Sequence, residues 1–478
     1  MLQYNYINAD PGAGKTDWAI KQSIRWTQLG HPVMFVVPTT VLCDEIQQRS
    51  QHRIEAIHSK NRNASVSLEI AEIMVIVAKT HTPRAIVVTD AAFQLIPYLT
   101  DPGNWIIIRD EPKEPLMITE LRCPDSRDLI LTEFIATRAI ANSNLFVAGA
   151  PKTSQYSLTD TEDSILGEIT RLKQLLQNNK FEILIDQLAL DNDIFRYSVY
   201  QKPELYAEWG EVYFMGANFQ DTFIYHMWTQ AGVVWREKPV SLPRLPSDRL
   251  RIYYRFNLAA AGWSKSRRNR PFGRGTYFTE YQRWIQQELP DNDFVYVVNN
   301  EYGSDPFGGT RMPAECHGLN RFRSFHRVVL GASYLVNQTY EPFYQYYGAS
   351  TTDARGMRGT QYYVQQITRT DIRNYAGTDT VHAYVPTLRE ALDLLRYFPD
   401  AHVIGLEEST PRFGQLLPCG YPVDNFQADL TDLTAIAPSI TWGARPNDIN
   451  VNSEPLEKPR LNAIAHVSSK NQGSYYNI

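Results

Sequence analysis

The run ADPGAGKT at residues 9–16 combines small residues with a lysine and a threonine at the spacing of phosphate-binding loops. It fits the pattern A-x-x-G-x-G-K-T, with Ala9 where the first glycine usually stands. Small residues let successive backbone N–H groups turn toward an anion, and a following helix adds its positive N-terminus. Lys15 would reach the β- and γ-phosphates of a nucleoside triphosphate, and Thr16 would hold Mg²⁺. The residues expected to bind the nucleotide are Pro11, Gly12, Ala13, Gly14, Lys15 and Thr16.

Two adjacent carboxylates, Asp110 and Glu111, end the apolar run NWIIIRDEP at residues 104–112. Ligands of parallel α/β sheets bind at the carboxyl ends of the strands, where these side chains would lie. Asp110 could hold Mg²⁺ through water, and Glu111 could orient and deprotonate an attacking water. An isolated pair of this kind is usually a solvated turn, but the upstream phosphate loop favours hydrolysis of a nucleoside triphosphate.

A third group of polar residues recurs at intervals of four near the other end of the chain. Gln361, Gln365, Arg369 and Arg373 would share one face of a helix predicted over residues 359–374. Two arginines on one face can stabilise the charge of a transferring phosphoryl group. A solvated polar face with ordinary ion pairs is the alternative.

Strands and helices must alternate to position these groups, and the hydrophobic pattern predicts that they do. Short apolar runs predict strands, and periodic segments predict helices, which together indicate mostly parallel α/β sheets. In the first series we expect strands at 3–8, 32–38, 84–90 and 104–112, with helices at 14–30, 39–54 and 91–99. In the second we expect strands at 250–256, 293–300, 327–335 and 379–386, with helices at 278–289, 359–374 and 387–398. A strand and a helix at 210–228 return to the first series.

These patterns divide the chain of 478 residues into four parts. Residues 1–112 with 206–245 form a first α/β domain, and residues 246–405 form a second. Residues 113–205 read as an insertion or helical elaboration, with helical character over 167–190. Residues 406–478 are a C-terminal extension, which is rich in Asn, Pro and Ser after about residue 440 and is expected to be loosely ordered.

Composition excludes several other classes of protein. The net charge of −5 excludes a uniformly basic binder but leaves room for a local basic channel. The four cysteines have no C-x-x-C spacing, which argues against a zinc site or redox pair and favours a reducing compartment. No signal peptide and no run of 18 apolar residues is found, so we expect a cytoplasmic protein without a membrane span.

Taken together, the motifs resemble those of superfamily 2 helicases, in which two RecA-like lobes sandwich ATP and grip a nucleic-acid strand. ADPGAGKT resembles motif I, IIIRDEP resembles motif II, and QQITRTDIR resembles motif VI. Fainter matches are VVPTTVL for motif Ia, VVTD for motif Ib and CHGLNRF for motif V. FMGANF at 214–219 resembles motif III, with FVAGAP at 146–151 as a competing candidate. The resemblance runs from residue 1 to about residue 400.

The sequence also departs from the family pattern. Motif II reads D-E-P-K, so no named subfamily is indicated. Motif VI has Thr368 in place of glycine, and its second arginine comes one position late, which favours Arg369 over Arg373 as the arginine finger.

The resemblance implies two RecA-like parallel-sheet domains in tandem and an ATP-dependent helicase or translocase that uses ATP and Mg²⁺. Gly318, in motif V, would lie near the γ-phosphate. A phage or plasmid protein of replication or recombination fits by analogy. A helicase-like ATPase that remodels or anchors a complex without unwinding, or another P-loop DNA motor, remains an alternative. The expected catalytic residues are Lys15, Asp110, Glu111, Gln365, Arg369 and Arg373.

Nucleic acid is the expected partner, with single-stranded DNA favoured over RNA. Thr39 and Thr89 follow strands and could bind phosphates, although helix capping explains them equally well. The basic run KSRRNRPFGR at 265–274 and the segment HGLNRFR at 317–323 could contact the backbone of the strand. A solvated loop is the alternative for the basic run. The residues expected to contact nucleic acid are Thr39, Thr89, Arg267, Arg268, Arg270, His317 and Arg321.

Overall fold

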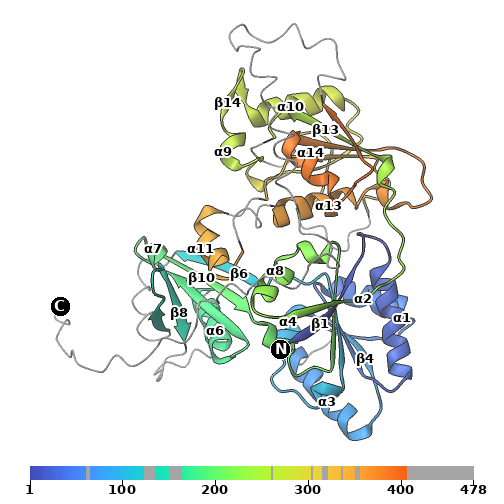
Figure 1. Cartoon of the computed structure of the whole chain (residues 1–478), viewed down its shortest axis with the longest axis vertical. Coiled ribbons are helices and arrows are strands. Elements are labelled where there is room, and N and C mark those ends of the chain that lie inside the picture. Colours follow the sequence, from blue (N-terminus) through green and yellow to red (C-terminus); the bar gives the residue numbers. More distant parts are fainter. Residues whose placement is uncertain are drawn as a thin grey trace, which may run out of the picture. The chain divides into compact units, whose positions relative to one another are not determined.

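Two parallel β-sheets with flanking helices organise the computed structural model of the chain (Figure 1). The first has seven strands in the order β12-β1-β11-β5-β2-β4-β3, and the second has six in the order β17-β16-β18-β19-β13-β20. Every strand pair within both sheets is parallel, which confirms the predicted fold class. The structure describes residues 1–405 except 61–64, 123–134, 150–163, 260–261, 303–304, 315–320, 335–336 and 350–355. The predicted tail at 406–478 therefore lies outside the described residues.

The first sheet is buried on both faces because its strands carry apolar side chains on both. In β2, Met34 and Val36 belong to the cluster that packs against α3 and α8, whereas Phe35 belongs to the cluster that packs against α1 and α2. The strands are β1 (Gln3–Asn8), β2 (Val33–Val37), β3 (Glu55–Ile57), β4 (Ala85–Thr89), β5 (Ile106–Asp110), β11 (Glu211–Gly216) and β12 (Val234–Glu237). The helices are α1 (Lys15–Gln28), α2 (Thr40–Arg49), α3 (Val66–Thr80), α4 (Asp90–Gln94) and α8 (Phe223–Gln230).

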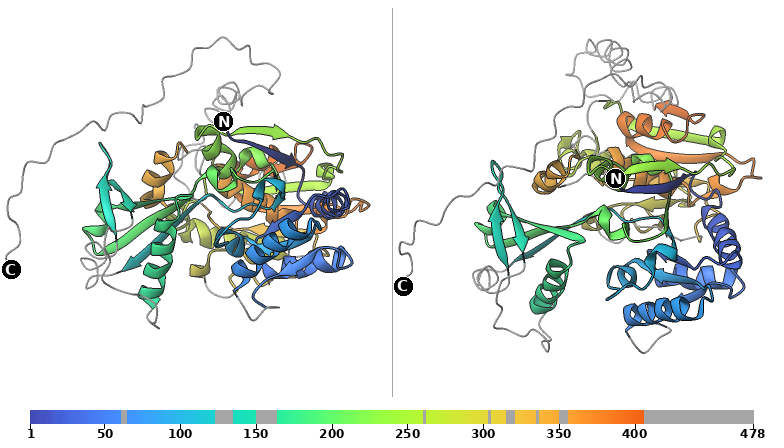
Figure 2. Two further views of the ribbon diagram at one scale, coloured as in Figure 1. Left: turned by 90° about the horizontal axis from the view of Figure 1, so that it is seen from below. Right: turned by 60° about the horizontal axis from the view of Figure 1, so that its bottom comes forward.

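An antiparallel sheet of five strands, ordered β6-β10-β9-β8-β7, occupies the segment between β5 and β11 (Figure 2). The expectation of a helical elaboration is therefore wrong for most of this segment. The helix predicted over 167–190 ends at Gln177, and Phe181–Asp186 is a strand, because its isoleucines and leucine pair on both sides with neighbouring strands. The elements are β6 (Leu116–Arg122), β7 (Ala136–Ala139), β8 (Leu145–Gly149), α6 (Ser164–Gln177), β9 (Phe181–Asp186), α7 (Gln187–Leu190) and β10 (Ile194–Gln201).

The second parallel sheet packs on an apolar core of its own, to which β13, β16, β18 and β19 contribute buried side chains. Its strands are β13 (Leu250–Phe256), β16 (Val295–Val297), β17 (Thr310–Arg311), β18 (Arg327–Leu330), β19 (Val381–Thr387) and β20 (His402–Gly405). A small hairpin joins β14 (Pro271–Phe272) to β15 (Gly275–Thr276). Its helices are α9 (Lys265–Arg268), α10 (Tyr277–Glu288), α13 (Gln361–Ile367) and α14 (Leu388–Leu395). Helix α11 (Glu341–Tyr346), which lies within the same part of the sequence, packs Phe343 and Tyr344 into the apolar cluster of the first sheet instead.

The helix predicted over 359–374 is shorter than expected. Helix α13 ends at Ile367, and Asp371–Arg373 forms a separate 3-10 turn. The hydroxyl of Thr368 donates to the carbonyl of Gln365 at 2.9 Å, and that of Thr370 donates to the carbonyl of Ile367 at 2.6 Å. Such local side-chain bonds compete with helical hydrogen bonding, which accounts for the break.

None of the helices in the described part of the chain has both the length and the apolar content that a membrane crossing requires.

Candidate functional site

The phosphate loop joins β1 to α1 through two glycines with left-handed backbone. Gly12 has φ of 80° and Gly14, the N-cap of α1, has φ of 93°, conformations that residues with a Cβ rarely adopt. The buried ammonium of Lys15 donates to the backbone carbonyls of Ala9 at 2.8 Å and Asp10 at 2.9 Å. Burial lowers the pKa of Lys15 to about 8, while Asp110 and Glu111 oppose the change. An incoming phosphate would offer this ammonium a charged partner in place of neutral carbonyls.

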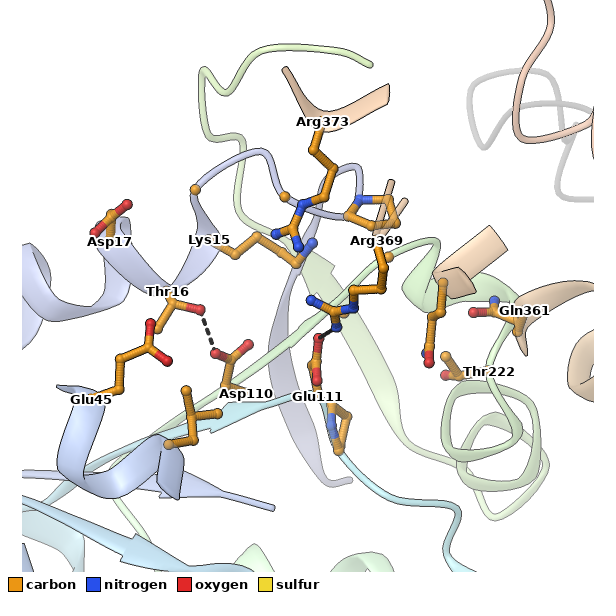
Figure 3. Close-up of a pocket in the computed structure, with 18 of the residues that line it drawn as sticks. Lys15, Thr16, Asp17, Glu45, Asp110, Glu111, Thr222, Gln361, Arg369 and Arg373 are labelled. Atoms are coloured by element: carbon orange, nitrogen blue, oxygen red, sulfur yellow. Dashed lines mark hydrogen bonds and ion pairs between the residues drawn. The ribbon is translucent and has the colours of Figure 1, made fainter. Parts of the chain in front are cut away.

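Thr16 and Asp110 provide adjacent oxygen atoms at the start of α1 and the end of β5. The hydroxyl of Thr16 donates to Oδ2 of Asp110 at 2.7 Å (Figure 3). Burial and the charge of Glu111 raise the pKa of Asp110 to about 6. A desolvated carboxylate beside a hydroxyl oxygen fits Mg²⁺, which prefers hard oxygen ligands and would compensate the buried charge.

Glu111 follows with φ of 48°, and its backbone N–H donates to the carbonyl of Met215 on β11 at 3.0 Å. This bond fixes the turn after β5 to the neighbouring strand. Oε1 of Glu111 lies 3.9 Å from Nη2 of Arg369 (Figure 3). Arg369 comes from the second lobe, the part of the chain built on the second parallel sheet, whereas Glu111 belongs to the first lobe, built on the first.

Arg373 lies directly against the phosphate loop. A Cβ placed on Gly12 would come within 2.1 Å of Nε of Arg373, so only glycine leaves room for this guanidinium. Burial, together with the positive charges of Arg369 and Arg323, lowers the pKa of Arg373 to about 10. Three arginine side chains held this close together, those of Arg323, Arg369 and Arg373, indicate a site suited to a multiply charged anion.

Three polar atoms from the second lobe are buried at this site without a hydrogen-bond partner among the described residues. They are Oε1 of Gln365, Nε of Arg369 and Nη1 of Arg373. Buried polar atoms in proteins are normally paired, so unpaired ones beside a cavity suggest a ligand that completes them.

A cavity of about 400 Å³ connects these groups. The break after α13 does not scatter the four residues spaced by four, because all of them line this cavity. Of the residues predicted from the sequence, those lining it are Pro11, Gly12, Gly14, Lys15, Thr16, Asp110, Glu111, Gln361, Gln365, Arg369 and Arg373. Ala13 does not line it and is buried, and Gly318 lies outside the described residues.

The cavity also includes residues that were not assigned to nucleotide binding from the sequence. Leu42, Glu45 and Arg49 share one face of α2 at spacings of three and four, a signal that could have been read with the loop. Arg49 donates to Glu45 at 2.8 Å and pairs with Asp17 in the first turn of α1. Arg323, two residues beyond Arg321, lines the cavity where Arg321 does not.

The two candidates for motif III are separated by the topology. Gly216, the last residue of β11, and Ala217 line the cavity together with Thr222 at the N-cap of α8. In contrast, residues 146–149 belong to β8 of the antiparallel sheet and do not line it. FMGANF is therefore the segment positioned next to the phosphate loop and its cavity.

The predicted nucleic-acid contacts at the first lobe are helix caps. The hydroxyl of Thr39 accepts from the N–H of Leu42 at 3.3 Å, and that of Thr89 accepts from the N–H of Ala92 at 3.3 Å. Capping uses one lone pair of each hydroxyl and leaves its proton available for a phosphate.

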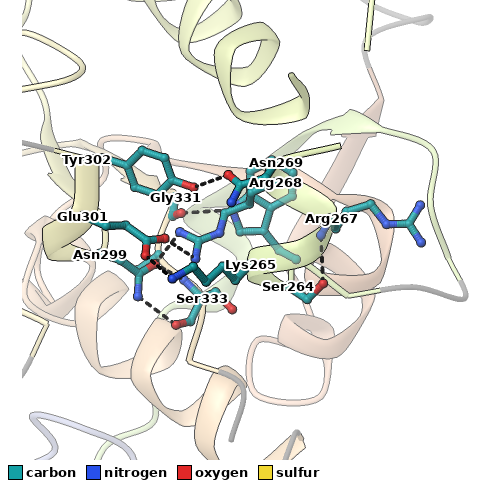
Figure 4. Close-up of polar contacts among 12 residues, drawn as sticks. Ser264, Lys265, Arg267, Arg268, Asn269, Asn299, Glu301, Tyr302, Gly331 and Ser333 are labelled. Atoms are coloured by element: carbon teal, nitrogen blue, oxygen red, sulfur yellow. Dashed lines mark hydrogen bonds and ion pairs between the residues drawn. The ribbon is translucent and has the colours of Figure 1, made fainter. Parts of the chain in front are cut away.

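The basic run of the second lobe divides into buried and exposed residues. Arg268 is 1% exposed and donates to Asn299 at 2.7 Å and to Glu301 at 3.0 Å, so its expected contact with nucleic acid is wrong in this conformation (Figure 4). Arg270 is exposed, and Arg267 is half-buried over the ring of Tyr277. Of the other predicted contacts, Arg321 is exposed, and His317 lies outside the described residues.

No protein-family model and no curated protein sequence matches this chain. Among solved structures, it is similar to apo XPD, with a TM-score of 0.46, 13% identity, and coverage of 84% of this chain and 97% of that one. It is also similar to an XPD helicase (TM-score 0.45, 11% identity, 84% and 96% covered). A third is Saccharomyces cerevisiae Dbp5 bound to RNA and ADP-BeF3 (TM-score 0.37, 8% identity, 85% and 86% covered).

The chain resembles helicase structures in its fold. This likeness concerns architecture alone.

Proposed function

We propose that this chain is an ATP-dependent helicase or translocase that hydrolyses ATP between its two parallel-sheet lobes and moves along nucleic acid. One observation carries the proposal. Lys15, Asp110 and Glu111 from the first lobe face Arg369 and Arg373 from the second across one cavity, and the lobe-two groups have buried polar atoms without partners.

Each residue has a role that its position supports. The phosphate loop and Lys15 hold the β- and γ-phosphates. Glu111, fixed by its backbone bond to β11, orients water in line with the γ-phosphorus and accepts its proton. Arg369 and Arg373 neutralise the charge that spreads over the γ-phosphoryl oxygens.

Thr16 and Asp110 would hold Mg²⁺, which supplies electrostatic stabilisation to the β- and γ-phosphate oxygens when bound. The hydrogen bond between them already sets their oxygen atoms side by side. The carboxylate must be ionised to bind a cation, so the pKa of about 6 for Asp110 predicts that metal affinity rises through that pH.

Contacts between the lobes provide a route from hydrolysis to movement. Arg396, after α14, pairs with Asp221 beyond β11, and the backbone N–H of Leu245 donates to Asp10 of the phosphate loop at 2.8 Å. Both contacts link the second lobe, or the chain leading to it, with segments beside the nucleotide. Opening and closing of the cleft on each ATP cycle would then shift the lobes along a strand.

Nucleic acid would lie across exposed groups of both lobes. Thr39 and Thr89 can donate hydroxyl protons to phosphates, while Arg267, Arg270 and Arg321 can make salt-dependent contacts with the backbone. We favour single-stranded DNA over RNA, with a role in replication or recombination in a reducing compartment such as the cytoplasm.

The test measures ATP hydrolysis by wild type and Lys15→Ala in the presence of no polymer, single-stranded DNA, duplex DNA or RNA. Stimulation by one polymer, lost in Lys15→Ala, would support the motor and identify its track. Hydrolysis that is indifferent to every polymer would exclude a helicase and favour an ATPase that remodels or anchors a complex.

A further inference from the structure

A second cavity of about 410 Å³ adjoins the phosphate site on the second lobe. It shares the side chains of Arg323 and Arg373 with the first cavity. A ligand whose phosphates lie against Arg373 could therefore extend past the two arginines into this second space. The residues that line it are Arg323, Ser324, Asp371, Arg373, Asn374 and Tyr375.

Tyr375 stands on a tight turn whose ends are hydrogen-bonded. The N–H of Gly377 donates to the carbonyl of Asn374 at 2.9 Å, and Asn and Gly at the two ends are typical of a β-turn. A Cβ on Gly377 would lie 3.0 Å from both terminal nitrogens of Arg249, so the turn packs closely on that guanidinium.

Arg249 holds the turn in place through hydrogen bonds to its backbone. This buried side chain donates to the carbonyl of Asn374 at 2.8 Å and to that of Asp379 at 2.7 Å, and it pairs with the carboxylate of Asp371. The ring of Tyr375 is nevertheless 37% exposed. An exposed aromatic ring on a rigid turn is a preformed surface for stacking, because little conformational entropy remains to be lost.

Tyr375 also lies close to the phosphate loop. Burial raises the pKa of its phenol, the carboxylate of Asp10 raises it further, and Arg373 opposes the change. Asp10 belongs to the loop, and Arg373 touches it at Gly12. The ring is thus positioned at the edge of the site where the phosphates would bind.

The carboxylate of Asp371, the acidic group of this cavity that could read the edge of a base, is already paired. Both carboxylate oxygens of Asp371 have partners, since Oδ2 pairs with Arg249 and Oδ1 accepts from Nδ2 of Asn374 at 3.3 Å. Stacking without such contacts discriminates little among bases, since every base has a π-face.

We propose that the second cavity holds the base and ribose of a nucleoside triphosphate, with the base stacked on Tyr375, and that the site accepts ATP, GTP, CTP and UTP with little preference. This inference rests on the proposed function, because it requires the triphosphate to lie in the first cavity.

Equilibrium binding by titration calorimetry in the presence of Mg²⁺ tests it, with the four nucleotides and inorganic tripolyphosphate as probes. The full chain is compared with Tyr375→Ala, Tyr375→Phe and, as a matched control, Tyr98→Ala, which removes a ring of 45% exposure that lines neither cavity. We expect the four nucleotides to bind within about fivefold of one another. Tyr375→Ala should weaken all four by on the order of tenfold and leave tripolyphosphate unchanged. Tyr375→Phe and Tyr98→Ala should behave as wild type.

Nucleotide affinities unchanged in Tyr375→Ala, or one base preferred by on the order of a hundredfold, would overturn the inference. In that case tripolyphosphate binding that is lost in Lys15→Ala would still support the proposed function. If wild type binds neither ATP nor tripolyphosphate, the proposed function fails and this inference fails with it.

Discussion

Replacing Asp110 with Asn should stabilise the nucleotide-free protein while abolishing ATP hydrolysis. The side chain is 4% exposed and lies beside Glu111, so its ionised form is costly to fold around. Asn has the same shape, is neutral, and can still accept the hydrogen bond from Thr16. The substitution therefore removes a buried charge with little change in packing.

The magnitude follows from the change in pKa. Folding raises the pKa of Asp110 from 3.8 to about 6, and a shift of one pKa unit corresponds to about 1.36 kcal/mol. The rise therefore corresponds to about 3 kcal/mol as an upper limit. Part of this rise comes from the charge of Glu111 and not from burial alone, so a gain in unfolding free energy of about 1 to 3 kcal/mol is expected for the variant. For a lobe of this size that is a rise of several degrees in Tm, at roughly 2–4 °C per kcal/mol.

The stability gained by Asp110→Asn over wild type should depend on pH. Because the folded pKa is raised, the stability that wild type gains from protonated Asp110 is complete below the unfolded pKa and is lost as pH rises through about 6. Thermal melts should therefore separate the two proteins above about pH 7 and bring them together near pH 4. Asp17→Asn is the control, because its side chain at the cavity rim is 61% exposed and should give no gain. Equal melting of wild type and Asp110→Asn at high pH would refute the reasoning.

Three further predictions concern the phosphate loop, a buried ion pair of the first sheet and the basic run of the second lobe. Gly12→Ala should reduce kcat/KM for ATP by about tenfold or more, since its Cβ would lie 2.1 Å from Nε of Arg373. Gly30→Ala is the control: it carries similar backbone strain, but its Cβ would have no other atom within 4 Å, so steady-state hydrolysis should be unchanged. Arg109→Ala should lower the unfolding free energy by about 3–5 kcal/mol in denaturant titrations, because it leaves the buried carboxylate of Asp90 without its ion-pair partner. A loss below about 1 kcal/mol would contradict this. Arg268→Ala should lower Tm without a specific effect on nucleic-acid affinity, whereas Arg270→Ala should weaken binding and flatten its salt dependence without lowering Tm; the reverse pattern would contradict the assignment.

Much of the fold could be predicted because local patterns and long-range packing agree there. The run VMFVV is apolar throughout, and β2 is buried on both faces, as a central parallel strand must be. The phosphate loop needs glycine where the backbone is left-handed, and Gly14 satisfies that need within the sequence itself. Strand β3 and helix α3 were not predicted, because three residues are too few to show periodicity and α3 is apolar around much of its surface.

The candidate site was predictable only in part. Asp110 and Lys15 belong to motifs whose chemistry is visible in a few neighbouring residues. Arg323 comes to the cavity through tertiary packing, which no local pattern encodes, whereas the spacing of Glu45 and Arg49 along one face of α2 could have been read from the sequence. Arg268 carries the same charge as its exposed neighbours, and only the fold reveals that Glu301 and Asn299 hold it inside the lobe.

The central claim is that both lobes form one hydrolytic site, and single-turnover hydrolysis of ATP by Arg369→Ala tests it most directly. Arg389→Ala, which removes a half-buried arginine on α14 outside the cavity, is the matched control. We predict that Arg369→Ala slows hydrolysis by about 10³-fold with ATP affinity nearly unchanged, while the control hydrolyses ATP at the wild-type rate. Hydrolysis by Arg369→Ala at the wild-type rate would contradict the claim, because the second lobe would then contribute nothing to the chemistry.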